Sequence, residues 1–583
     1  MACILDPAQF PGHRQAHHRF PGTTNRPATG PVEDPASRED ADVTRSAPQT
    51  PPPRPTAADA DPLDGIFLRG DVPRIVPVTD PATVPGADVD LLVVPCIAGP
   101  SGLSLPDDLP LPRTAVTDLW KTLMETGVTG AAGEVQSVPA PAGVRARQVL
   151  AVGLGSTDTG STAGADGTAD PTGRRDRRIR AAAGAASRAL RSLPGTALTV
   201  LSLLGRYSPT AAVEGHALGA YRYTGLRTAG PAEGGIARLG VLVDGQLAAF
   251  ARACTVVEAV ATARDIVNAP TGSLDPARLA ALAAGLAARS GIGAEILDAT
   301  ELGDRRFGGI LGAGGGSVHA PRLLRLVHRP EPLAGQDRVP HIALVGAAVT
   351  AGSAGAAGVT DLAGSSAAAA AAVAATVAAA ELELPVAVTA TVPVVELASD
   401  APALRPGSVL RHVDGTTTEI SGCDPTTPTD PSDTVRTATS LVLADAVARA
   451  VADSPDLLVT VSAVTGSRTL PFGDRTAAVT GSPALRDLLV DLADRAGEDA
   501  WAAPLPVESD REIGSEVADL RTAAPDRYLP AFVPAGTPRA HVDVAGPAVN
   551  SGAPYGDIPG RASGRPVRTL VALLGSARDY ADR

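Results

Sequence analysis

The chain has 583 residues, 44% of them hydrophobic, so it can bury a large core and is long enough for two or more domains. Its 50 basic and 63 acidic residues give a formal net charge of -13, which repels nucleic-acid phosphates unless a local basic patch compensates. The densest basic stretch, residues 174–180, precedes an alanine-rich segment. It is typical of a solvated helix start, with an anion contact as the alternative. We therefore expect no nucleic-acid partner.

The first 62 residues are rich in Pro, Asp, Arg, Thr and Ala and include the run PQTPPPRP. Such a composition cannot bury enough apolar surface to form a core, so we predict a disordered leader over residues 1–62. His13, His17 and His18 lie in this leader. A metal-binding tail is one interpretation of them, and solvated chain is the simpler one.

The sequence also predicts a compartment. The N-terminus MACILDPAQF does not pair a basic region with an apolar one, so we expect no signal peptide. Cys3, Cys96, Cys254 and Cys423 are scattered and form no C-x-x-C pair, which favours reduced thiols and a cytoplasmic location. The most uniform apolar run, residues 367–380, is too short and too rich in alanine to span a membrane. A helix packed on a sheet explains it better.

From Leu63 onward, short β-branched runs alternate with helical stretches, which predicts an α/β fold of mainly parallel or mixed sheets flanked by helices. We place an N-terminal α/β domain at residues 63–240 and a C-terminal α/β domain at 241–583. A linking helix is predicted from Gln246 to Asn268, where Asn268 and Pro270 signal its end. The C-terminal domain then alternates in chain order: a helix at 276–290, strands at 293–297, 323–328 and 342–349, a helix at 365–383 and a strand at 386–393.

Several segments resemble, in order and spacing, the cytosol (leucyl) aminopeptidase family. They lie at residues 133–155, 211–228, 263–276, 308–328, 391–410, 440–450, 515–520, 541–548 and 563–574. The resemblance covers roughly residues 63–575. It implies a two-domain leucyl aminopeptidase fold, a catalytic domain that binds two divalent metals, release of N-terminal amino acids from peptides, and hexamers assembled through the catalytic domains.

The family's first ligand motif, V-G-K-G-x-T-F-D-S-G-G, matches residues 345–355 poorly. Ala347 stands where the resemblance places a ligand lysine, and Gly352 stands where it places a ligand aspartate. The chain is shorter than the family pattern after this point, so the catalytic lysine of K-P has no counterpart. Asp361 falls on the aspartate of D-M-G-G-A-A and is the single ligand that remains.

The second ligand motif, N-T-D-A-E-G-R, is also replaced. Arg436, Ala438 and Ser440 stand where the resemblance places an aspartate, a glutamate and an arginine thought to hold a catalytic bicarbonate. The chain contains one lysine, Lys121, which lies in the N-terminal region and can serve neither family role. Downstream of Leu520 the chain lacks the G-G-R-x-A-G stretch that lines the family's substrate pocket.

Two neighbouring cations need several anionic oxygens to offset their charge, and Asp361 alone cannot supply them. Without the metals there is no Lewis acid to polarise a peptide carbonyl or to activate water. We therefore predict a non-catalytic family homologue with a structural or regulatory role and expect no cofactor. Its expected partners are further copies of itself, as in the family's hexamers, or an active relative. Peptide binding without cleavage is a further alternative, and no membrane partner is expected.

One alternative interpretation is that the chain retains catalytic activity. A helix is predicted at Ser440, and the segment before it carries a Pro/Thr/Asp insert. In this insert, Asp424, Asp430 and Asp433 could join Asp361 and His412 to bind Mg, Mn or Zn. The chain would then be a metal-dependent leucyl aminopeptidase with a remodelled site. A solvated Asp-Pro loop is the simpler interpretation, since flexible loops seldom hold ligands precisely enough for metals.

Overall fold

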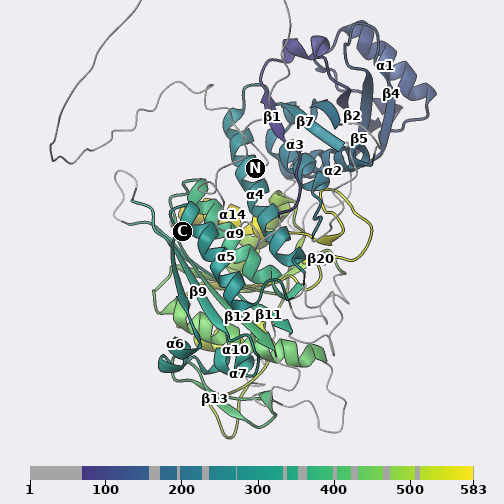
Figure 1. Ribbon diagram of the computed structural model, residues 1–583. Helices are drawn as coiled ribbons and strands as arrows, with labels where there is room; N and C mark the ends of the chain where they lie inside the picture. The colour runs from purple at the N-terminus through teal and green to yellow at the C-terminus, as the bar shows by residue number, and fades with distance from the viewer. Residues whose placement is uncertain are drawn as a thin grey trace, which may run out of the picture. The chain divides into compact units, whose positions relative to one another are not determined.

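The computed structural model describes residues 69–156, 171–192, 197–225, 235–270, 272–332, 338–351, 364–397, 404–421, 431–463, 473–505 and 513–581. All of them belong to one compact unit, Gly65–Arg583. Within it the fold is α/β with two domains, each a sheet flanked by helices (Figure 1), as predicted. The leader over 1–62 lies outside the described residues, and the boundaries at 62 and 240 stay predictions.

The first sheet has seven strands in the order β1-β7-β6-β2-β5-β4, with β3 paired to β2. The strands are β1 (Ile75–Val78), β2 (Leu91–Gly99), β3 (Gly102–Ser104), β4 (Val135–Pro139), β5 (Gln148–Ser156), β6 (Ala197–Ser202) and β7 (Gly235–Leu242). Pairing is parallel from β1 to β5, and β3 and β4 are antiparallel. The sheet is therefore mainly parallel, with antiparallel additions.

Three helices accompany this sheet: α1 (Arg113–Glu125), α2 (Pro171–Arg191) and α3 (Pro209–Ala220). Helices α2 and α3 pack backbone against backbone, because a Cβ atom at Gly219 would lie only 2.4 Å from the Cα atom of Gly184. Every residue of α3 except Thr210 is buried. The mostly apolar sequence of α3, in which Glu214 and His216 are the charged or titratable exceptions, thus reflects a helix enclosed on nearly all sides.

The second sheet has nine strands in the order β17-β16-β19-β15-β10-β12-β9-β8, with β11 paired to β12. The strands are β8 (Gly293–Leu297), β9 (Arg322–His328), β10 (His341–Gly346), β11 (Ala348–Ala351), β12 (Ala387–Leu397), β15 (Leu457–Ser462), β16 (Ala477–Gly481), β17 (Ala500–Ala502) and β19 (Arg539–Asp543). The centre is parallel, while β8, β9 and β16 pair antiparallel to a neighbour. This sheet is mixed.

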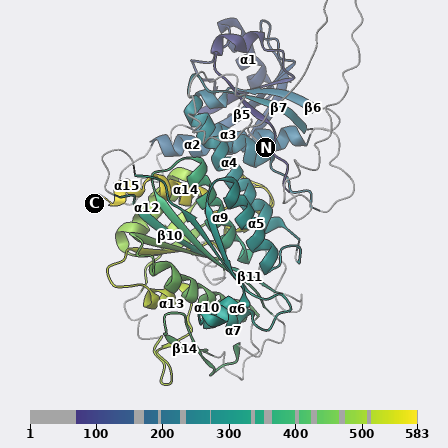
Figure 2. The same ribbon diagram turned by 60° about the vertical axis from the view of Figure 1, so that its left-hand side comes forward.

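Helices cover both faces of the second sheet (Figures 1 and 2). One face carries α4 (Leu247–Asn268), α5 (Pro276–Arg289), α9 (Ala367–Glu381), α12 (Pro483–Ala496) and α14 (Val567–Gly575). The other face carries α7 (Gly308–Gly314), α10 (Pro431–Val451) and α13 (Pro525–Tyr528). The 3-10 turn Leu529–Phe532 continues α13. Short elements complete the domain: α6 (Ala299–Asp304), α15 (Ala577–Ala581), and the strands β13 (Val409–Arg411), β14 (Thr417–Glu419), β18 (Leu520–Arg521), β20 (Val549–Asn550) and β21 (Arg561–Ala562).

Helix α9 confirms the helix predicted from the alanine-rich run. It contacts β10 and β12 on one side and α4 and α14 on the other, and nearly all of its residues are buried. Alanine allows this burial because its small side chain lets the backbones of the helix and the strands approach closely. A Cβ atom at Gly346 would lie 2.3 Å from the carbonyl oxygen of Ala368. Among the described residues, no helix is long and apolar enough to cross a membrane.

Three predicted boundaries are wrong. The strand predicted at 342–349 divides after Gly346, because β10 pairs with β12 and β15 whereas β11 follows β12 alone. The strand predicted at 386–393 continues to Leu397, since β11 pairs with β12 from Val394 to Leu397. The helix expected near Ser440 begins at Pro431, where a proline at the first helical position favours a helix start.

A buried ionic cluster joins elements far apart in the sequence. The guanidinium of Arg568, on α14, contacts Glu214 at 3.3 Å, Glu498 at 3.4 Å and Asp557 at 2.9 Å. Arg180, on α2, contacts the same Glu214 at 2.7 Å. All five side chains are at most 9% exposed. The cluster therefore depends on complete pairing, because an unpaired charge at this depth is costly.

Candidate functional site

The first position at which the resemblance places a metal ligand lies at the carboxyl end of a central parallel strand, where open α/β sheets present their sites. Ala347 follows the last residue of β10 and is 2% exposed. Its neighbour Val349, on β11, is 1% exposed. The first ligand position thus lies inside the protein, between two strands, and carries only a methyl group.

The second set of ligand positions lies on α10. Ala438 and Ser440 are completely buried, whereas Arg436 is half-buried. The Ser440 hydroxyl donates a 2.7 Å hydrogen bond to the carbonyl oxygen of Ala523, which holds α10 against the segment after β18. Positions 436 and 440 are four residues apart and share a face of α10, so their different exposure shows that the helix enters the core from Ala438 onward.

Ala347 and Ala438 belong to one continuous apolar cluster, and this decides whether the site suits a metal. Its buried members include Val349, Leu443 and Phe532. Divalent metals need carboxylate, imidazole or carbonyl ligands, and these positions offer two methyl groups and one hydroxyl that is already hydrogen-bonded. The side chains at positions 347, 438 and 440 therefore do not fit a divalent metal centre.

Other predicted site residues lie outside the described residues: Gly352, Asp361, Asp424 and Asp430. Asp433 lies in the first turn of α10, but its side chain is not described. In the described part of the chain, no three residues among His, Cys, Asp and Glu come together in a way that could hold a metal. The ligand roles suggested for Asp361 and Asp424 thus stay predictions.

The metal role considered for His412 is wrong. His412 is fully buried, its Nδ1 lies 2.9 Å from the carboxylate of Asp445, and its Nε2 lies 2.9 Å from the Tyr528 hydroxyl. Asp445 also accepts the backbone N–H of Ile310 at 2.9 Å. With both ring nitrogens engaged, His412 links α10, α7 and α13 in the core instead of facing a metal.

The sequence contained a weak signal for this network that the prediction missed. Asp445 is the only charged residue in the helical stretch LVLADAVA, which is otherwise apolar. A lone carboxylate in such a stretch indicates a buried partner, because burying an unpaired charge is costly. Its partner His412, and Tyr528 on the other side of the imidazole, are too distant in sequence for spacing to identify them.

A second pair of metal-capable residues lies at the end of β12. The Glu396 carboxylate, on a residue 6% exposed, lies 2.9 Å from the His319 Nδ1 and accepts the Ser317 hydroxyl at 2.6 Å. Glu396 is also paired in register with Thr350 of β11. One carboxylate and one imidazole fall short of the ligand number that a divalent cation needs. We interpret the pair as holding the turn after α7 against β12.

The shortened segment after Leu520 covers the apolar cluster. Tyr528, Leu529 and Phe532 are at most 5% exposed and belong to the cluster that contains Ala438. The ring centroids of Tyr528 and Phe532 lie 5.1 Å apart in an edge-to-face arrangement. Where the resemblance expected a pocket wall, the described chain therefore places packed aromatic side chains.

Two family models match the chain. Residues 261–571 match the catalytic domain of the cytosol aminopeptidase family, and residues 109–230 match the N-terminal domain of that family. A probable cytosol aminopeptidase of Corynebacterium diphtheriae is 38% identical over 505 residues, which cover 84% of this chain and 94% of the relative. A probable cytosol aminopeptidase of Rhodococcus opacus is 38% identical over 514 residues, which cover 84% of this chain and 95% of the relative.

Solved structures agree with this relationship. The bottromycin maturation enzyme BotP in complex with Mn is 28% identical, with a TM-score of 0.68 over 84% of this chain and 99% of that chain. A tomato leucine aminopeptidase mutant is 22% identical, with a TM-score of 0.68 over 89% of this chain and 100% of that chain. The second likeness shows the fold alone.

Proposed function

Because the chain belongs to the cytosol (leucyl) aminopeptidase family, we propose that it is a non-catalytic member whose role is structural or regulatory. The observation that carries the proposal is the apolar cluster around Ala347 and Ala438. A dinuclear metal centre there would need carboxylates that the helix and strand do not provide. Without metals, the family's hydrolysis loses both its Lewis acid and its activated water.

A metal-dependent aminopeptidase with a remodelled site is the second candidate. It is favoured by the relatives named probable cytosol aminopeptidases at 38% identity and by the Mn-bound BotP at 28%. In this chain Asp361 and Asp424 would have to contribute ligands, and Mn or Zn would be the metal. Bound there, the metal would supply Lewis acidity.

Metal content and turnover, measured together, separate the two candidates. The full chain is stripped with EDTA, incubated with Mn²⁺ or Zn²⁺, dialysed and subjected to elemental analysis, and hydrolysis of leucine p-nitroanilide is followed in parallel. We expect far less than one ion per chain and no turnover above that of Asp361→Ala. The exposed Asp304→Ala serves as the matched control. Near-stoichiometric metal and turnover, both lost in Asp361→Ala and kept in Asp304→Ala, would establish the enzyme instead.

We propose that the chain's partners are further copies of itself or an active relative. Strand β17 ends the second sheet, and its Trp501 is 56% exposed. A terminal strand with a large exposed aromatic side chain is a natural contact surface, because tryptophan is enriched at protein interfaces. Light scattering of the purified chain should give an oligomer, as the family's hexamers imply. A monomer at all concentrations would contradict self-assembly.

A further inference from the structure

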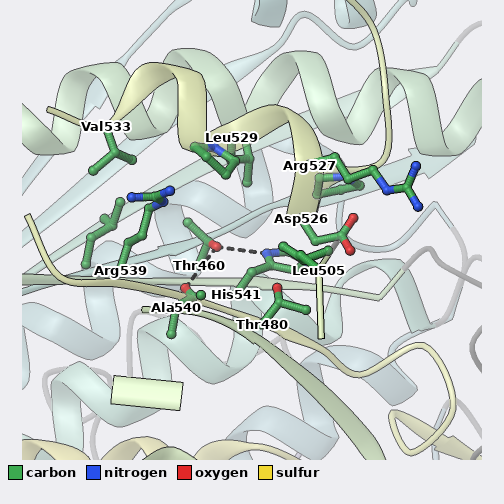
Figure 3. Close-up of a pocket in the computed structure, with 14 residues that line it drawn as sticks. Thr460, Thr480, Leu505, Asp526, Arg527, Leu529, Val533, Arg539, Ala540 and His541 are labelled. Carbon is green, nitrogen blue, oxygen red and sulfur yellow. Dashed lines mark hydrogen bonds between the residues drawn. The ribbon is translucent and has the colours of Figure 1, made fainter. Parts of the chain in front are cut away.

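Buried polar atoms without a hydrogen-bond partner point to a bound water molecule or ion, because such atoms are nearly always satisfied. In the described part of the chain, the Thr480 hydroxyl is one of them, and Thr480 lines a cavity of about 250 Å³ under α13 (Figure 3). A water molecule is enough to satisfy a neutral hydroxyl of this kind. Charged groups without a partner need a stronger explanation, and they gather in the ionic cluster around Arg568.

This ionic cluster holds more positive than negative charge. Its charged residues are each at most 7% exposed: Arg180, Glu214, Arg264, Glu498, Asp557, Arg565 and Arg568. Four arginines therefore face three carboxylates, which leaves one positive charge in excess. An uncompensated charge at this depth is costly, so the cluster requires a further negative charge.

Two neighbouring acids do not supply the missing charge. The side chain of Asp499 lies 3.5 Å from Arg565, but it is 37% exposed and also contacts Arg177, whose charge it offsets. Asp265 follows Arg264 in α4, and burial raises the pKa of Asp265 to about 7. Asp265 is therefore only partly ionised at neutral pH.

Arg264 makes its hydrogen bonds to backbone carbonyls and not to an acid. Its Nε donates to Ser563 at 2.9 Å, its Nη1 to Leu218 at 2.7 Å and its Nη2 to Asp557 at 3.1 Å. These bonds satisfy the donors of the guanidinium group. They do not cancel its charge, because a carbonyl oxygen is neutral.

Two other arginines keep an N–H group without a partner among the described residues. These groups are the Nη1 of Arg180 and the Nε of Arg565, and both residues are 4% exposed. Elsewhere the same side chains are engaged, since Arg180 Nε donates to Glu214 at 2.7 Å and Arg565 Nη1 donates to the Arg475 carbonyl. Burial acts to raise the pKa of Asp557, yet the guanidinium groups of the cluster, these two among them, hold it below its ordinary 3.8. Both arginines therefore lie near one carboxylate.

The Asp557 carboxylate does not complete these hydrogen bonds. Its Oδ2 lies 2.9 Å from Arg568 Nη1 and, like the two N–H groups, has no hydrogen-bond partner of suitable geometry among the described residues. A water molecule bound here would leave the excess charge in place. A small anion would accept from the arginine N–H groups and also cancel that charge.

We propose that the cluster binds one small monovalent anion, chloride or an ion of its size, beside Arg180 and Arg565. Arg180 belongs to α2, which accompanies the first sheet, and Arg565 leads into α14, which covers the second. The anion therefore joins the two domains, and its concentration would regulate how firmly they dock. None of the degenerate positions 347, 436, 438 and 440 belongs to the cluster, so this binding does not depend on the proposed loss of catalysis.

Urea denaturation of the full chain tests the proposal without any substitution, with chloride exchanged for gluconate at constant ionic strength. Gluconate is too large for a site between packed guanidinium groups, and constant ionic strength keeps charge screening fixed. We expect the urea midpoint to rise with chloride, by the equivalent of about 1.4 kcal/mol for each tenfold increase above the dissociation constant. Bromide should act like chloride, and its anomalous scattering in a crystal should place it beside Arg180 and Arg565.

Two conservative variants should change the response to chloride in opposite directions. Arg565→Gln removes the excess positive charge, so it should abolish the chloride dependence. Asp557→Asn removes an acid beside the ion, so chloride should act at a concentration at least about 10-fold lower. The exposed control Arg113→Gln should keep the wild-type dependence. A cluster that only holds the fold together would not give these opposite responses.

Three results would overturn the proposal. Equal urea midpoints in chloride and gluconate would leave water as the occupant. An unchanged chloride dependence in Arg565→Gln would place the ion elsewhere, and a weaker response in Asp557→Asn would contradict the charge argument. If a variant does not fold, the titration of the unsubstituted chain and the position of bromide still decide the question.

Discussion

Restoring the family's glutamate at position 438 tests whether the region around this position is an open metal-binding site or part of the packed core. Ala438 is completely buried in the apolar cluster, so Ala438→Glu would bring a carboxyl group into contact with hydrocarbon. A glutamate buried in this way stays protonated at neutral pH, because desolvation raises its pKa above its usual value near 4.3. Keeping it protonated at pH 7 costs about 1.36 kcal/mol for each pH unit between 4.3 and 7, which is about 4 kcal/mol.

The pH dependence identifies this cost. Since the folded state would hold a proton that the unfolded state releases above pH 4.3, the loss of stability should be about 1 kcal/mol at pH 5 and about 4 kcal/mol at pH 7. The isosteric Ala438→Gln has the same bulk but cannot ionise, so it reports the pH-independent cost of overpacking, about 1–3 kcal/mol. Thr434→Glu, at an exposed position of the same helix, should change stability by less than about 0.5 kcal/mol.

Urea denaturation at pH 5 and pH 7, followed by fluorescence, measures the difference between the Glu and Gln variants. The reasoning fails if Ala438→Glu is as stable as Ala438→Gln at both pH values. It fails more decisively if added Mn²⁺ raises the urea midpoint of the Glu variant alone. A cation would then lie within reach of position 438, and the apolar cluster would not describe that region.

The remaining predictions concern buried ionisable groups. Arg568→Met removes the cation that three buried carboxylates share, so the urea midpoint should fall by the equivalent of about 3–5 kcal/mol. The exposed control Arg113→Met should keep the wild-type midpoint, and similar midpoints for the two variants would contradict the network. Burial raises the pKa of Asp265 from its ordinary 3.8 to about 7, against the opposing hydrogen bond from Tyr221, so the folded state holds the extra proton between these values. The free energy of unfolding should therefore fall as pH rises from 4 to 7, and Asp265→Asn should reduce that fall. Melting temperatures that change with pH equally in the variant and the wild type would refute this. Burial also raises the pKa of Cys96 to about 12, so iodoacetamide should label it only after unfolding, and rapid native labelling would contradict its placement.

The sequence predicted the elements whose signals are local. Alternating β-branched runs indicated the strands, and the alanine-rich run indicated α9, because helix propensity and apolar length are properties of short stretches. Asn268 ended α4 as its position before Pro270 indicated. The family was also recognisable, since ordered motifs survive where single residues have changed.

The site was predictable only in part. Motif positions showed that Ala347, Ala438 and Ser440 could not be ligands, and the structure adds that two of them share one apolar cluster. The network around His412 could not be predicted, because Asp445 and Tyr528 are distant from it in sequence and only tertiary packing brings the three side chains together.

The ionic cluster around Arg568 has a consequence for synthesis of the chain. Glu214 and Arg568 are 354 positions apart, and Arg568 lies in the penultimate helix. At about 5–20 residues per second, a ribosome needs roughly 20–70 s to pass from one to the other. During that interval Arg180 is the only arginine of the cluster available to Glu214, so the cluster is completed only after α14 has left the ribosome. A premature stop codon just before α14 would therefore yield a chain that holds buried acids without their cation and becomes a substrate for quality-control proteases.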